Sequence, residues 1–226
     1  MSAVRWSRPL YRLYRGHLLR QVRGRPLPGH VALILDGNRR DALRHGVTDP
    51  RAIYDRGAGI LGAFEAKIGA LARDPRVRRH RIRVRAVGRL GLLPPSTVAA
   101  VREAEAATAG HERMTLTIAV AYGGREEVVD AVRALLREET RHGADLTGLA
   151  ERLEPAMIER HLYTAGLPEP DLIIRTSGEV RLSGFLLWQS THSEFYFTDV
   201  NWPAFREIDF LRALRSFQQR ERRFGR

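Results

Sequence analysis

Short apolar runs alternate along this chain with longer segments of helical periodicity, and this alternation limits the folds that the chain can adopt. These runs are residues 31–35, 82–87, 116–120, 172–174 and 195–197, and in the run at 82–87 arginines alternate with apolar residues, which predicts a strand with the arginines outward. The helical segments are residues 39–45, 60–72, 96–107, 125–142 and 208–222. Strands that alternate with helices predict an α/β fold, in which helices flank both faces of a mostly parallel sheet. A length of 226 residues is enough for a single domain with a sizeable core.

The run at residues 172–174 ends abruptly in a polar segment that contains Arg175, Arg181 and Ser183. A buried strand that opens onto arginines and hydroxyls is typical of an anion site. The planar guanidinium group can bind two phosphate oxygens at once, whereas a lysine acts only as a point charge. This segment therefore predicts a site for a diphosphate.

A second polar cluster follows the run at residues 31–35, where the chain reads Asp36-Gly-Asn-Arg-Arg40. A strand, a glycine turn and a helix form an arrangement that binds phosphate, because the helix begins with unpaired backbone N–H groups. Asp36 would lie at the carboxyl end of a parallel strand, where a carboxylate can hold Mg²⁺ against the same phosphate. Taken alone, this motif fits equally an Asp-Gly turn that caps an ordinary helix.

Together the two clusters resemble the cis-prenyltransferase family, the isoprenyl diphosphate synthases related to undecaprenyl diphosphate synthase. The resemblance covers residues 30–40, with the sequence HVALILDGNRR, and residues 118–127, with the sequence IAVAYGGREE. It is densest over residues 170–225, which include RTSGE, RLSGFLLWQ and SEFYFTD in the family's order and spacing. The opening PLYRLY at residues 9–14 looks most like actinobacterial members, including short-chain Z-farnesyl diphosphate synthases.

The resemblance implies an enzyme that joins isopentenyl diphosphate to an allylic diphosphate with Mg²⁺ as cofactor and forms a new cis double bond. It also implies a homodimer. At the matching positions, the resemblance implies that Asp36 is catalytic and binds the metal, and that the allylic diphosphate is bound by Gly37, Asn38, Arg39 and Arg40. It implies that isopentenyl diphosphate is bound by Arg175, Arg181 and Ser183. Glu194 would assist metal and diphosphate binding near the dimer interface, and the C-terminal Gly225 would close over a neighbouring subunit's site.

One block of the family pattern is missing from this chain. After the Asp36 turn, family members carry a helix, a second parallel strand and a loop of the Ser-Thr-Glu-Asn type, which orients substrate and removes the proton. Here residues 54–58 lead directly into the helical segment at 60–72, and no such loop sequence occurs. About one βα unit, roughly 30 residues, is therefore absent after about residue 58. Two interpretations remain open: an active cis-prenyltransferase, or a non-catalytic, deletion-damaged member that acts as a diphosphate-binding or partner subunit.

The composition favours a cytoplasmic protein. The chain has no cysteine, no apolar run long enough to span a membrane and no apolar signal segment behind its basic N-terminus. We expect a basic amphipathic segment at residues 1–28 and the cis-prenyltransferase-like domain at residues 29–226. The basic segment can contact an anionic membrane or pack on its own domain. The net charge of +12 attracts polyanions, but no nucleic-acid-binding signature accompanies it, so we expect no nucleic acid partner.

Overall fold

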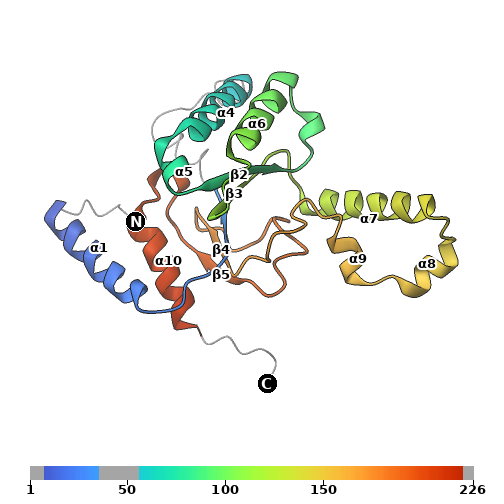
Figure 1. Cartoon of the computed structure of the whole chain (residues 1–226). Helices are drawn as coiled ribbons and strands as arrows, with labels where there is room; N and C mark the ends of the chain where they lie inside the picture. Colours follow the sequence, from blue (N-terminus) through green and yellow to red (C-terminus); the bar gives the residue numbers. More distant parts are fainter. Residues whose placement is uncertain (1–7, 36–55, 221–226) are drawn as a thin grey trace. The chain divides into compact units, whose positions relative to one another are not determined.

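The computed structural model describes residues 8–35 and 56–220 (Figure 1). The chain divides into two compact units. The first unit combines residues 1–48 with residues 168–226, so the strands that precede the two predicted polar clusters belong to the same unit. The second unit is the intervening segment, residues 49–167.

The first unit contains a parallel sheet of three strands in the order β1-β4-β5. Its strands are β1 (Val31–Ile34), β4 (Leu172–Arg175) and β5 (Glu194–Phe197). All four residues of the central strand β4 are buried. A parallel strand that is covered on both faces has no need of polar alternation, which explains the unbroken apolar run in its sequence.

Helices α1 (Arg8–Arg23) and α10 (Glu207–Gln219) belong to the same unit, and they pack against each other. The apolar core of the unit joins both helices to β4, through Leu18, Leu172, Ile174 and Ile208. Leu172 and Ile174 contribute together because residues two apart in a strand point to the same face. The short 3₁₀ helix η2 (Trp202–Ala204) precedes α10.

The second unit contains a parallel pair of strands, β2 (Ile82–Val87) and β3 (Met114–Ala119). Helix α4 (Arg56–Arg73) packs on α6 (Pro95–Thr108), and α6 in turn packs on β2. Ile68, Val101 and Ala104 form the core of this layer. Gly88, just after β2, has a φ of +122°, and a Cβ there would lie 2.1 Å from the Val120 carbonyl oxygen. Only glycine allows the two strand ends to come this close.

Five shorter or peripheral elements complete the second unit: α5 (Pro75–Arg79), η1 (Leu90–Leu92), α7 (Gly124–Arg141), α8 (Leu146–Arg152) and α9 (Pro155–Glu159). Two of the helices begin at an aspartate. The side chain of Asp74 accepts a hydrogen bond from the Arg76 backbone N–H at 2.7 Å, and Asp145 accepts one from Gly148 at 2.7 Å. Such N-caps satisfy backbone donors that have no partner inside the helix.

The α/β class and the parallel direction of the predicted strands are confirmed in the described part of the chain. There, β1-β4-β5 and β2-β3 are separate sheets. The predicted helix at residues 39–45 lies outside the described residues. Helix α1 lies within the predicted N-terminal segment and shares a core with β4. The domain boundary at residue 28 stays a prediction.

Candidate active site

The predicted site is organised by the carboxyl ends of three neighbouring strands. Ile34, the last residue of β1, is paired in register with Arg175, the last residue of β4, and Arg175 is paired with Phe197 at the end of β5. Thr176 strengthens this edge, because its backbone N–H and its Oγ1 both donate to the Ile34 carbonyl, at 3.3 and 3.2 Å. The segments that follow β1, β4 and β5 therefore leave the sheet from one edge, where ligands bind in open α/β sheets.

Arg175 is a buried arginine at this edge, with only 4% of its surface exposed. Its Nη1 donates to Ser183 Oγ at 3.0 Å and also to the backbone carbonyl of Arg181. These contacts fix the guanidinium plane before any ligand binds, so less side-chain entropy is lost when an anion is bound. The structure thus brings together Arg175 and Ser183, as the sequence predicted.

Arg181 contributes its backbone carbonyl to this cluster, whereas its side chain is directed elsewhere. Its Nη2 lies 2.9 Å from Glu179 Oε2, and the Arg181 side chain is 69% exposed while that of Glu179 is 18% exposed. The charge of Arg181 is therefore partly balanced by a carboxylate two residues earlier. Glu179 belongs to the RTSGE motif, and nothing in that motif alone indicated a role for it.

The loop after β4 has an unusual backbone. Ser177 and Gly178 have φ angles of +76° and +74°, and Ser183 and Gly184 have φ angles of +51° and +76°. Left-handed conformations at non-glycine residues cost of the order of 1–3 kcal/mol and persist where the surrounding structure fixes them. Here the Ser177 N–H donates to the Val200 carbonyl and the Gly178 N–H donates to the Thr198 carbonyl, both at 2.9 Å. The loop is thereby bound to the segment that follows β5.

A further carboxylate lies against this loop. A Cβ at Gly178 would be 3.0 Å from Asp199 Oδ1, so the Asp199 side chain approaches the Gly178 backbone closely. Asp199 is the second residue after β5 and therefore belongs to the same sheet edge as Arg175. Asp199 ends the SEFYFTD motif and was not among the predicted site residues.

Glu194 lies at the other end of the sheet. It is the first residue of β5 and is paired in register with Leu172, whereas Arg175 is paired with Phe197. The two levels are three residue steps apart along the strand, or about 10 Å. The Glu194 carboxylate is bound by Arg220 Nη1 at 2.5 Å. Within one chain, therefore, Glu194 does not join the Arg175 cluster, and its predicted metal role stays a prediction.

The remaining predicted site residues lie outside the described residues: Asp36, Gly37, Asn38, Arg39, Arg40 and Gly225. Asp36 nevertheless follows β1 by two residues, so the sheet edge from which its segment departs is known. Among the described residues, no group of three or more histidine, aspartate or glutamate side chains could hold a metal ion.

Comparison with known proteins identifies the family. The sequence model of the family described as "Putative undecaprenyl diphosphate synthase" matches residues 58–225 of this chain. The chain belongs to the cis-prenyltransferase family. An isoprenyl transferase of Thermus thermophilus is 48% identical to it, over 97% of this chain and 97% of that protein. A (2Z,6E)-farnesyl diphosphate synthase of Thermobifida fusca is 47% identical, over 96% and 97% of the two chains.

A solved structure supports the same assignment. The crystal structure of lavandulyl diphosphate synthase from Lavandula x intermedia, in complex with dimethylallyl diphosphate, is 30% identical in sequence and has a TM-score of 0.76. The match covers 88% of this chain and 99% of that chain. This cis-prenyltransferase is accordingly a prenyltransferase enzyme by family and by fold.

The comparison also bears on the missing block. The alignment with the Thermus thermophilus protein extends over 256 residues, whereas this chain has 226, so at least 30 aligned positions hold no residue of this chain. That difference equals about one βα unit. The family match begins at residue 58, the place where the sequence predicted the break. Both observations agree with a shortened cis-prenyltransferase.

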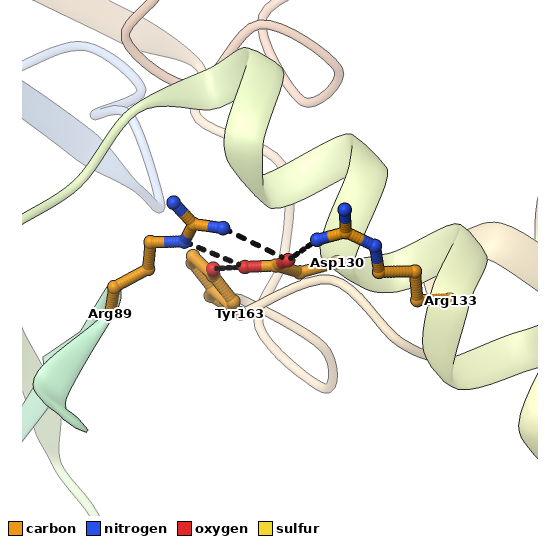
Figure 2. A network of polar contacts seen from close by, with 4 residues as sticks. All are labelled: Arg89, Asp130, Arg133 and Tyr163. Carbon is orange, nitrogen blue, oxygen red and sulfur yellow. Dashed lines mark hydrogen bonds and ion pairs between the residues drawn. The ribbon is translucent and has the colours of Figure 1, made fainter.

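A polar network in the second unit joins Arg89, two residues after β2, to Asp130 of helix α7 (Figure 2). Figure 2 shows Arg89 and Arg133 approaching the Asp130 carboxylate from opposite sides. Arg89 Nε donates to Asp130 at 3.0 Å, Arg133 Nη1 at 3.1 Å and the Tyr163 hydroxyl at 2.6 Å. The fully buried Glu127 accepts from the Tyr163 backbone N–H at 2.9 Å. The network therefore ties the segment after β2 and the segment after α9 to helix α7.

These contacts perturb two pKa values. The hydrogen bond from Arg89, followed by that from Tyr163, lowers the pKa of Asp130 to about 2. Burial, followed by the hydrogen bond to Asp130, raises the pKa of Tyr163 to about 12. The first shift favours the folded state only while Asp130 is ionised. Its stabilising effect is present above the ordinary carboxyl pKa and is lost as the pH falls from about 4 to about 2.

We expect Asp130→Asn to lower the free energy of unfolding by about 1–2 kcal/mol at pH 7, because three donors lose a charged acceptor. Urea unfolding at pH 7 and at pH 2.5 measures the effect, and the difference between wild type and variant should shrink at the lower pH. Glu112→Gln is a suitable control, since the side chain of Glu112 is 83% exposed. An equal loss of stability in both variants would contradict a specific role for the network.

Proposed function

We propose that this cis-prenyltransferase condenses isopentenyl diphosphate with an allylic diphosphate in a Mg²⁺-dependent reaction and releases a short Z-prenyl diphosphate. The observation that carries the proposal is the buried, pre-oriented Arg175–Ser183 pair, at the edge from which the Asp36 segment departs. One sheet edge can then hold two diphosphates with their prenyl groups close together. The name of the Thermobifida fusca relative, a farnesyl diphosphate synthase, supports a short product.

The residues act by positioning and by charge. Arg175 and Ser183 hold the diphosphate of isopentenyl diphosphate, and Arg181 joins them once that diphosphate competes with Glu179 for its guanidinium group. The backbone and arginines of residues 37–40 hold the allylic diphosphate, which departs as its C1–O bond breaks. Fixed donors aimed at the departing diphosphate lower the barrier, since negative charge accumulates there in the transition state.

Asp36 supplies the carboxylate expected for Mg²⁺ at this edge. Magnesium in phosphate sites is bound by one or two carboxylates together with phosphate oxygens and water, and Asp36 beside a diphosphate matches that donor set. When bound, the metal neutralises the charge of the departing diphosphate. Glu194 would assist from another position, near an interface between subunits.

We also propose that the protein is a cytoplasmic homodimer that works at the membrane periphery. Its product carries an apolar chain, which partitions into lipid. No helix in the described ranges combines the length and apolar character needed to cross a bilayer. The separation of Glu194 from Arg175 within one chain is compatible with a site that two subunits share.

The decisive experiment is a product assay on the purified protein. We expect labelled isopentenyl diphosphate, Mg²⁺ and geranyl or farnesyl diphosphate to give a labelled Z-prenyl product, and we expect none with Asp36→Ala. Sedimentation of the same preparation should give the mass of a dimer. A product of equal amount in Asp36→Ala would contradict the site, and a monomeric active enzyme would contradict the dimer.

The non-catalytic alternative rests on one specific observation, the 30 or more aligned positions that this chain lacks. It predicts a folded protein that binds diphosphate and makes no product. Binding can be measured by calorimetry with isopentenyl diphosphate, with Arg175→Ala as the control. Binding without turnover would establish this alternative.

A further inference from the structure

Helix α1 is held on α10 by its inner face. Leu18 and Val22 are buried between the helices and the sheet, with 0% and 4% of their surfaces exposed. Arg15 Nε donates to Glu207 Oε2 at 2.7 Å, and Arg212 Nε donates to the Tyr14 hydroxyl at 3.2 Å. The inner face of α1 therefore packs on the protein itself, which is one of the two roles that the amphipathic sequence allowed.

The outer face of α1 is apolar at its beginning. Leu10 is 53% exposed and Leu13 is 70% exposed, although both are large aliphatic side chains. They are three residues apart and so lie on one side of the helix, and the same side continues through His17 and Arg20. A helix that buries one apolar face and exposes a second has a surface left for another partner.

The charge of this region is entirely of one sign. Residues 1–35 contain seven arginines and no aspartate or glutamate. The side chains of Arg12, Arg20 and Arg23 are exposed. Within residues 8–35 and 56–220, no ion pair joins any of these three to a carboxylate. Exposed leucines beside unbalanced arginines match a surface that is both anionic and apolar at shallow depth.

We propose that the outer face of α1 docks this protein on an anionic lipid bilayer. Leu10 and Leu13 enter the boundary between headgroups and acyl chains, while Arg12, Arg20 and Arg23 bind lipid phosphates. The helix lies along the membrane surface and stays attached to α10 throughout, because its inner contacts are not used. A second copy of the chain is a poorer occupant, since two such faces would bring arginine against arginine. The use of the surface rests on the proposed function, in which the product is a lipid.

Vesicle flotation tests this docking without any substrate. The wild type should float with vesicles of phosphatidylglycerol and phosphatidylcholine and remain behind with pure phosphatidylcholine. Leu10→Ser combined with Leu13→Ser should lower the partition coefficient at least about tenfold. Leu146→Ser, at a leucine that is 76% exposed on α8, should leave it unchanged. The thermal unfolding temperatures of the variants show whether each one is folded.

The arginine contribution has a charge-matched control. Arg20→Gln with Arg23→Gln should lower the partition coefficient about tenfold or more, whereas Arg78→Gln with Arg79→Gln on α5, the same loss of charge at exposed positions, should have a much smaller effect. If both double variants lowered the partition coefficient equally, binding would depend only on the net charge of the protein, and the proposal would be overturned. Equal flotation of the wild type with both lipid mixtures would also overturn it. A change in dimer mass in the leucine variant, with unchanged flotation, would assign the face to a second copy instead.

Discussion

Arg175→Ala is expected to lower kcat/KM for isopentenyl diphosphate by about a hundred- to a thousandfold. Arg175 is buried, and Ser183 Oγ and the Arg181 carbonyl fix its guanidinium group. Its removal takes away a charge-assisted, oriented contact to a diphosphate, and the loss of one such donor costs about 10²–10³ in rate in other enzymes. The alanine also leaves a gap beside Ser183, which adds to the loss. Steady-state kinetics with varied isopentenyl diphosphate measures it.

Two further variants separate charge, geometry and folding. Arg175→Lys keeps the charge and loses the planar group, so we expect an intermediate loss of about ten- to a hundredfold. Arg102→Ala, at an exposed arginine on α6, should change neither kinetics nor stability. Because Arg175 belongs to a buried cluster, urea unfolding of every variant accompanies the kinetics. A stable Arg175→Ala protein with wild-type turnover would remove Arg175 from the site.

β4 could be predicted from the sequence because a parallel strand that is buried on both faces leaves a continuous apolar run, whereas β2 was indicated by arginines that alternate with apolar residues. β2 was found to the residue, and β3 begins at Met114, two residues earlier than predicted, because its first residues are exposed and lack an apolar signature. The alternation expected in β2 is present, with Arg83 exposed and Val84 buried at 1% exposure. The short helices α5, α8 and α9 were missed. Asp74 before Pro75 and Asp145 before Leu146 were usable capping signals for two of them.

The site was predictable where the chain itself brings residues together. Arg175 and Ser183 are eight residues apart on one strand and its following loop, so their contact could be inferred from the motif. The direction of β5 could also have separated Glu194 from Arg175, since one residue begins its strand and the other ends its own. Asp130 and Tyr163 could not be paired in this way. The two residues are 33 positions apart on different elements, and no periodicity in the sequence indicates that they are in contact.

The missing block predicted from the sequence includes a parallel strand. The edge strands of a sheet carry backbone N–H and C=O groups without a partner strand. When a chain lacks one strand, the strands that would have flanked it become edges that must be paired or covered in another way. In the described residues, β1 pairs with β4 alone, while β2 and β3 pair only with each other.

Insertion of the missing βα block after residue 58 is expected to raise turnover at least about a hundredfold. The block would be taken from a relative that carries the Ser-Thr-Glu-Asn type loop, since positioned groups that remove a proton contribute about 10²–10⁴ in rate. The added strand should also slow hydrogen exchange at one or more edges of β1, β2 and β3.

A second insertion, identical except for glycine and serine in place of the polar loop, distinguishes the effect of the loop on turnover from the effect of the strand on the fold. It should slow exchange in the same way and leave turnover at the level of the natural chain. Equal turnover in the two insertions would show that the block acts through the fold alone, and turnover in the natural chain as high as in the first insertion would show that this shortened enzyme removes the proton with residues of its own.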